Sequence, residues 1–134
     1  MITKDEAQNL LQDFLKIESI TPDVGDAFDF LERLFIKYNF EVQRVKFKSD
    51  DSYEVENMFA TIGSTAPHFC FAGHADVVTP GKVSDWSRPP FSGYIENNII
   101  FSRGAEDMKG ALLSSIIAGI NYIQNPIDQN HRLS

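Results

Sequence analysis

The sequence is short of features that cross-link a chain or anchor it in a membrane. Cys70 is its only cysteine, which excludes an intrachain disulfide and is typical of a reducing, cytoplasmic location. No apolar run approaches the roughly 18 residues that a membrane-spanning helix needs. The first residues, Met1 to Glu6, lack the basic start and apolar stretch of a signal peptide. We therefore expect a cytoplasmic protein without membrane association.

Positive charge is also scarce, because 12 Lys and Arg side chains stand against 19 Asp and Glu, a formal net charge of −7. This acidic balance disfavours binding to nucleic acid. The sequence has no glycine-rich phosphate loop of the dinucleotide-binding type and no serine nucleophile elbow. What is present is a chain of 134 residues, 43% hydrophobic, which is enough for one domain with a real core.

Helical patterns dominate the first forty residues. Thr3 and Glu6 form a capping-box pattern, and apolar residues follow at helical spacing, so residues 3–17 are predicted to form a helix. A second amphipathic helix is predicted over residues 26–38. Asn39 suits the left-handed position that ends it.

Strand patterns follow. Residues 40–48 alternate between apolar and polar, but the alternation changes phase between Val42 and Val45, which indicates a β-bulge. Residues 55–62 form a second predicted strand. Residues 68–73 are short, apolar and bounded by proline and glycine, which predicts a strand buried on both faces.

The rest of the chain begins with a long connection, residues 74–93, and loops of this length are usually functional. Residues 94–102 are predicted to form a hairpin that turns at two asparagines. Residues 108–123 carry an apolar helical stripe. Residues 127–134 show no pattern of a regular element.

His74 and Asp76 are the first candidates for chemistry, because they follow the predicted buried strand, where sites collect in α/β proteins. In an extended chain, positions i and i+2 point the same way. The imidazole could then bind a metal ion while the carboxylate accepts its other N–H. The alternative is a surface pair that caps a loop. Cys70, expected to be buried, is predicted to be inert.

Asp107 is the third candidate, at the turn into the last helix, where it could face the same cleft as His74. Its alternative role is that of a helix N-cap. Glu106 is predicted to be a solvated acid and Lys109 a surface cation. His68 and His131 rank lower, as a packed or edge histidine and as part of a polar tail.

The segment around His74 and Asp76 and the segment around Asp107 together indicate a family more specifically than either segment does alone. Two motifs occur in order, with Pro80-Gly81, Trp86 and Pro89-Pro90-Phe91 between them: Gly73-His74-Ala75-Asp76-Val77-Val78 and Arg103-Gly104-Ala105-Glu106-Asp107-Met108-Lys109-Gly110. This arrangement resembles the N-terminal part of the zinc-dependent aminoacylase and carboxypeptidase family. The resemblance extends from the first helix to about residue 123. The residues of the two motifs favour the desuccinylase branch of the family. Members of that branch release succinate from N-succinyl-diaminopimelate, a precursor in lysine and cell-wall synthesis.

The resemblance implies an α/β fold, an incomplete three-layer α/β/α catalytic domain with a mixed, mainly parallel sheet. Residues 1–134 would be its N-terminal part, without the lid and dimerisation domain through which the family forms homodimers. His74 would ligate one zinc ion, and Asp107 would bridge two. Cobalt is an alternative metal. Asp76 would be the active-site carboxylate that orients His74, and the Asp107–Met108 peptide would be cis. The substrate would be a small N-acyl amino acid.

Ligand counting sets a further expectation. The family's glutamate base and next glutamate ligand have no counterpart here, because no glutamate follows Glu106 and the remaining candidate ligands are Asp128 and His131. A catalytic zinc normally takes three protein ligands. We therefore expect weak zinc binding and no activity from the 134 residues alone. Two alternatives to this function stay open. One is a related acetylornithine deacetylase, aminoacylase or dipeptidase. The other is a non-catalytic truncated remnant or interaction module that pairs with a full-length relative through its exposed sheet. Self-association through open sheet edges is also expected.

Overall fold

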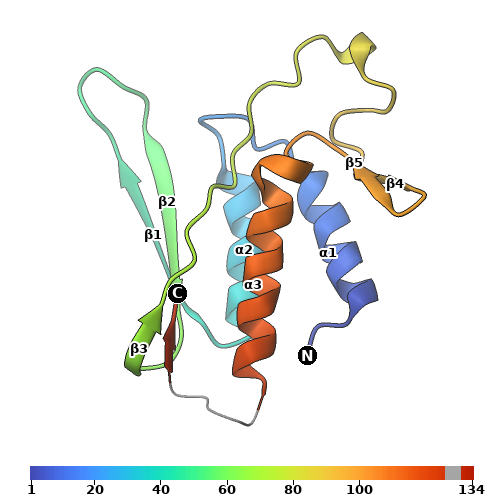
Figure 1. Cartoon of the computed structure of the whole chain (residues 1–134). Coiled ribbons are helices and arrows are strands. Elements are labelled where there is room, and N and C mark those ends of the chain that lie inside the picture. The colour runs from blue at the N-terminus through green and yellow to red at the C-terminus, as the bar shows by residue number, and fades with distance from the viewer. Residues whose placement is uncertain (126–130) are drawn as a thin grey trace.

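The computed structural model describes residues 1–125 and 131–134 (Figure 1). Its three α-helices are α1 (Lys4–Leu15), α2 (Gly25–Lys37) and α3 (Gly110–Ile123). Its strands are β1 (Glu41–Phe47), β2 (Val55–Thr61), β3 (Thr65–Phe69), β4 (Tyr94–Glu96), β5 (Ile99–Phe101) and β6 (His131–Leu133). The β1–β2 and β4–β5 pairs are antiparallel and the β3–β6 pair is parallel. The predicted α/β class is therefore confirmed.

The predicted helices are present, and local caps explain the start of α1 and the end of α2. Thr3 Oγ1 accepts a hydrogen bond from the backbone N–H of Glu6 at 3.3 Å, and Glu6 accepts one from the backbone N–H of Thr3 at 2.8 Å, which completes the capping box. Asn39 follows α2 with φ of 64°, the left-handed conformation predicted for it. None of the helices in the described residues is long and apolar enough to cross a membrane.

The core lies where the helices meet the β1–β2 pair and the end of β6. It contains these buried side chains: Phe14, Ala27, Leu31, Leu34, Phe40, Ala60, Leu113, Ile116, Ile120 and Leu133. The apolar stripes of all three helices contribute to it, as their periodicity predicts. Phe14 also stacks on Phe30, with ring centroids 5.3 Å apart, which joins α1 to α2.

The bulge predicted in β1 is wrong. β1 and β2 pair without interruption, from Glu41 opposite Thr61 to Phe47 opposite Val55. The change of phase has another cause, because Arg44 takes a half-buried inward position that an apolar side chain would normally occupy, while Val45 is exposed.

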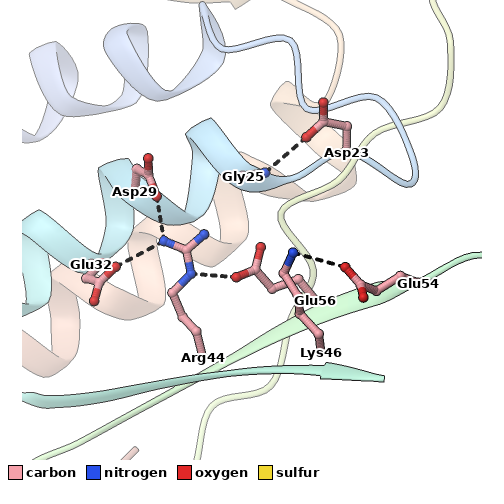
Figure 2. Close-up of polar contacts among 8 residues, drawn as sticks. All are labelled: Asp23, Gly25, Asp29, Glu32, Arg44, Lys46, Glu54 and Glu56. Carbon is pink, nitrogen blue, oxygen red and sulfur yellow. Dashed lines mark hydrogen bonds and ion pairs between the residues drawn. The ribbon is translucent and has the colours of Figure 1, made fainter. Parts of the chain in front are cut away.

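Three carboxylates hold Arg44 in that position (Figure 2). Its guanidinium binds Glu56 on β2 at 2.7 Å and Glu32 on α2 at 3.0 Å, and it also pairs with Asp29 on α2. The hydrogen bond from Arg44 lowers the pKa of Glu56 below its usual range. This cluster joins the β1–β2 hairpin to α2.

The strand predicted at residues 68–73 is also wrong in extent and burial. β3 ends at Phe69, and the side chains of Phe69 and Phe71 are 60% and 39% exposed. Cys70, expected to be buried, is exposed. An apolar run is typical of a strand that is covered on both faces, but the residues of β3 are exposed. Among the described residues, β6 is the strand that pairs with β3.

β6 was not expected, because residues 127–134 carry no strand pattern. Its position depends on distant partners, since Leu133 and Ile62 exchange two backbone hydrogen bonds of 2.9 Å. Ser134 N–H donates to Phe69 O at 3.0 Å, and Phe71 N–H donates to Ser134 O at 2.8 Å. Asp128, one of the candidate ligands, lies outside the described residues.

The connection from residue 74 to residue 93 is a long loop, as the sequence predicts, and it is irregular apart from a single bridge at Val77 and one 3₁₀ turn, Val83–Asp85. The β4–β5 hairpin turns at Asn97 and Asn98, with φ of 51° and 62°. That hairpin prediction is confirmed.

Candidate metal centre

The segment that carries His74 and Asp76 is fixed by the chain that follows α1. Ile20 and Val77 form a parallel bridge, in which Val77 N–H donates to Ser19 O at 2.8 Å. The buried Ser19 hydroxyl donates to Ala75 O at 2.7 Å. Ala75 and Val77 are buried, so the alternation of an extended chain turns His74 and Asp76 to the other side.

Asp107 lies in a tight turn, Ala105–Lys109, before α3. The turn begins at Gly104, whose φ is 80° and whose missing Cβ would lie 2.4 Å from Cγ1 of Val77. The Asp107–Met108 peptide is cis, as the family resemblance implies. Lys109 is the N-cap residue of α3, and no side chain caps it. The alternative role of Asp107 as a helix cap is therefore wrong, and its carboxylate is 87% exposed.

The three candidates meet in the structure. His74 Nε2 lies 3.0 Å from Oδ1 of Asp107. His74 Nδ1 lies 3.0 Å from the backbone oxygen of Asp76 and 3.2 Å from its Oδ1. Partial burial acts to lower the pKa of His74, but the hydrogen bonds and charges of Asp107 and Asp76 outweigh it, so its pKa is raised.

This donor set fits one part of a zinc site. Nitrogen and oxygen ligands each about 2.0–2.1 Å from a tetrahedral zinc lie roughly 3.3 Å apart, close to the separation of His74 Nε2 and Asp107 Oδ1. Asp76 at Nδ1 is the orienting carboxylate that metal-bound histidines usually have. No group of three or more His, Cys, Asp or Glu side chains able to hold a metal ion is found in residues 1–125 and 131–134.

The other histidines make contacts of their own elsewhere. His68 Nε2 lies 2.9 Å from Oγ of Ser134, and His131 Nδ1 lies 3.2 Å from the hydroxyl of Tyr122. Their low rank as metal ligands agrees with these contacts. Glu106 is exposed, as predicted.

Sequence reasoning misjudged Lys109, which is fully buried instead of being a surface cation. Its Nζ donates to Phe14 O at 3.1 Å and to Ile17 O at 2.7 Å, and it lies 4.8 Å from the centre of the Phe14 ring. Burial lowers the pKa of Lys109 to about 8. The sequence signal that could have indicated burial is the position of Lys109 directly before an apolar helix, between Met108 and Gly110.

Thr21, which the sequence does not single out as a site residue, lies beside Asp76. Its hydroxyl donates to Oδ2 of Asp76, on the side of the carboxylate away from His74. A cavity of 340 Å³ adjoins His74 and Asp76. Apolar side chains of β2, α2 and α3 line much of it, among them Phe28, Leu31, Phe59, Leu112 and Ile116.

Comparisons with known proteins show similarity in both sequence and fold. The model of peptidase family M20/M25/M40 matches residues 70–134. The crystal structure of an M20 family metallo-carboxypeptidase from Sulfolobus solfataricus superposes with a TM-score of 0.78 and 28% identity, over 96% of this chain and 29% of that one. Human carnosine dipeptidase 1 shares the fold, with a TM-score of 0.80 and 22% identity over 96% of this chain and 30% of its own. The chain is thus similar to members of peptidase family M20 in sequence and fold, and the resemblance stated from its motifs is confirmed.

Among curated proteins, the similar ones include succinyl-diaminopimelate desuccinylases. That of Rhodopseudomonas palustris (strain BisB18) is 40% identical over 126 residues, which are 94% of this chain and 32% of the relative. That of Bradyrhizobium sp. (strain ORS 278) is 38% identical over 120 residues, 90% of this chain and 31% of the relative. The chain spans about a third of the length of the curated relatives it matches.

Proposed function

We propose that residues 1–134 supply part of the active site of a zinc-dependent amidohydrolase that cleaves N-succinyl-diaminopimelate to succinate and diaminopimelate. The observation that carries the proposal is the convergence of His74 Nε2 and Asp107 Oδ1, 3.0 Å apart, with Asp76 behind Nδ1. The desuccinylase relatives at 38–40% identity support the choice of substrate.

Each of the three residues has a distinct part in this proposal. Asp76 accepts a hydrogen bond from Nδ1–H of His74. The proton therefore stays on Nδ1, and the Nε2 lone pair is free to bind the metal. Asp107 presents an exposed carboxylate that is able to bridge two ions. Two zinc ions held there would polarise the amide carbonyl and lower the pKa of a bound water. Cobalt could replace zinc at such ligands.

The 134 residues alone are expected to be inactive. His74 and Asp107 are fewer protein ligands than the three that a catalytic zinc normally takes, and His131 lies against Tyr122. The further ligands and a general base, which contributes about 10²–10⁴-fold to such reactions, would have to come from outside the described residues 1–125 and 131–134.

A complementation assay tests the proposal. The chain would be mixed with a polypeptide carrying the part of the Rhodopseudomonas palustris desuccinylase that lies beyond the match, in the presence of Zn²⁺. Release of succinate from N-succinyl-diaminopimelate, absent with either piece alone and absent with Asp107→Ala, is expected. N-acetylornithine, an N-acetyl amino acid and a dipeptide are the competing substrates. Preference for one of these would replace the desuccinylase assignment by that of a deacetylase, aminoacylase or dipeptidase.

A second candidate is a non-catalytic module that self-associates. Exposed apolar side chains on the strands favour it, because Phe47 and Phe69 are about 60% exposed and Phe59 is 42% exposed. Size-exclusion chromatography with light scattering tests this candidate, and a monomer at every concentration would remove it. For either candidate we propose a cytoplasmic location, where the exposed thiol of Cys70 would stay reduced.

A further inference from the structure

The hydroxyl group of Thr21 makes a contact that the proposed mechanism does not yet use. It donates to Oδ2 of Asp76, while Oδ1 of the same carboxylate lies 3.2 Å from Nδ1 of His74. Val77 O is a second, more distant acceptor, 3.4 Å from the hydroxyl. Thr21, Asp76, His74 and Asp107 therefore form one chain of polar contacts that ends at His74 Nε2 and Oδ1 of Asp107.

The backbone holds Thr21 in place without help from its side chain. Thr21 N–H donates to Val77 O at 3.1 Å, next to the parallel bridge between Ile20 and Val77. The bridge places Thr21 beside Asp76 whatever side chain stands at position 21. The hydroxyl can therefore be removed without removing the contact that positions the segment.

Asp76 needs a second partner because a carboxylate can rotate about its Cβ–Cγ bond. Its side chain is about a third exposed, so the protein interior does not lock it. A donor on Oδ2 leaves Oδ1 facing the histidine, where it adds a charged acceptor for Nδ1–H at 3.2 Å beside the backbone oxygen of Asp76 at 3.0 Å. Without that donor, the opposite tautomer, in which Nε2–H donates to Asp107, becomes competitive, since Asp107 lies 3.0 Å from Nε2.

We propose that Thr21 is a positioning residue: its hydroxyl orients Asp76 and thereby keeps the proton of His74 on Nδ1, leaving Nε2 free for a metal ion. This inference deepens the proposed function and rests on it for its consequence, although the tautomer itself is a property of the metal-free chain. Thr21 acts only through Asp76 and is not a ligand.

The experiment uses the full chain labelled with ¹⁵N-histidine. Long-range ¹H–¹⁵N correlation spectra at alkaline pH, where the imidazole is neutral, report which ring nitrogen of His74 carries the proton. We expect Nδ1–H in the native chain and in Thr21→Ser, which keeps the hydroxyl. In Thr21→Val, which has a similar shape but no donor, the Nε2–H form should gain population. Thr61→Val is the matched control, because the Thr61 hydroxyl donates to Leu133 O, outside the site.

A second readout is zinc affinity, measured by competition with a chromophoric chelator. Contacts behind a metal ligand change affinity by 10–100-fold, so a contact one step further out should cost roughly 3- to 10-fold in Thr21→Val and nothing in Thr21→Ser or Thr61→Val. Thermal unfolding of each variant shows that all are folded. An unchanged His74 tautomer in folded Thr21→Val would overturn the proposal. If the tautomer shifts but the native chain binds no zinc, the positioning role stands and the metal-site assignment fails.

Discussion

Nε2 of His74 and Oδ1 of Asp107 lie 3.0 Å apart, although 33 residues separate them in the sequence. Neither residue reaches this position by local structure alone. His74 is placed by the bridge to the chain after α1, and Asp107 by a turn against Val77. The pair is therefore a product of the whole fold, and its metal-binding role can be tested by substitution.

Substituting the candidate ligands should abolish zinc binding. His74→Ala and Asp107→Ala each remove a donor, whereas Asp76→Asn removes only the orienting charge and should weaken affinity by about 10–100-fold. Chelator competition followed by elemental analysis measures these losses. His68→Ala is the matched control, since His68 is an exposed histidine that contacts Ser134. Zinc binding that survives in His74→Ala would show that the metal is held elsewhere.

Lys109 should make stability depend on pH. Its folded pKa is about 8, against an ordinary value of 10.5. Between these pH values the unfolded chain holds a proton that the folded chain has lost, so this group's contribution to stability rises with pH through that window. Below pH 8 the buried charge costs on the order of 3 kcal/mol relative to a lysine in water.

Urea denaturation of the native chain and Lys109→Met at pH 7 and at pH 10.5 measures this dependence. The native chain should gain stability relative to the variant at the higher pH, because the other titrating groups are common to both. A difference between the two chains that does not change with pH would contradict the inferred burial of the ammonium group.

Arg44 should stabilise the junction between the β1–β2 hairpin and α2. Arg44→Met leaves three carboxylates without their shared cation and should cost about 1–3 kcal/mol of unfolding free energy. Lys46→Met removes only the exposed pair with Glu54 and should cost less than about 1 kcal/mol. Equal costs for the two variants would argue against the cluster as a junction.

The same cluster should contribute to acid denaturation. The pKa of Glu56 is lowered below 4.5, so the stability that it contributes is present above that pH and is lost as the pH falls through the lower, folded value. Glu56→Gln should therefore flatten the stability profile in acid. Parallel profiles for the native chain and the variant would show that Glu56 is not paired.

Gly104 should tolerate no side chain. Alanine there would meet Val77 at 2.4 Å and hold a φ of 80°, whereas alanine at Gly81 would hold a φ of 72° with nothing within 4 Å. Both substitutions should cost about 1 kcal/mol or more for the left-handed conformation, and Gly104→Ala should cost more because of the clash. Denaturation curves measure the costs. Gly104→Ala should also weaken zinc binding by moving Asp107, and Gly81→Ala should not.

The sequence predicted what local patterns determine. The capping box of Thr3 and Glu6, the left-handed Asn39 and the asparagine turn each depend on residues a few positions apart, and each was confirmed. The motifs around His74 and Asp107 also identified the residues that the fold brings together.

Features determined by distant partners were not predictable. Lys109 carries a charge that suggests the surface, and only carbonyl oxygens more than 90 residues away show why it is buried. Arg44 disturbed the apolar alternation of β1 because its counterions lie on another element. The 68–73 pattern identified an apolar segment but not which faces of it are covered, since that depends on neighbours the pattern does not contain.

The bridge between Ile20 and Val77 has a consequence for the order of folding. The Ser19–Ala75 hydrogen bond closes a separation of 56 residues, and the contacts of Lys109 with Phe14 and Ile17 close 95 and 92. Contacts between such distant positions carry a larger loop-closure entropy than a helix or a hairpin, so they form after the local elements. The candidate metal centre should therefore assemble late, once α1, the His74 segment and the start of α3 have met. Zinc added to a refolding chain would then act on the last steps of folding and leave the early formation of the helices unchanged.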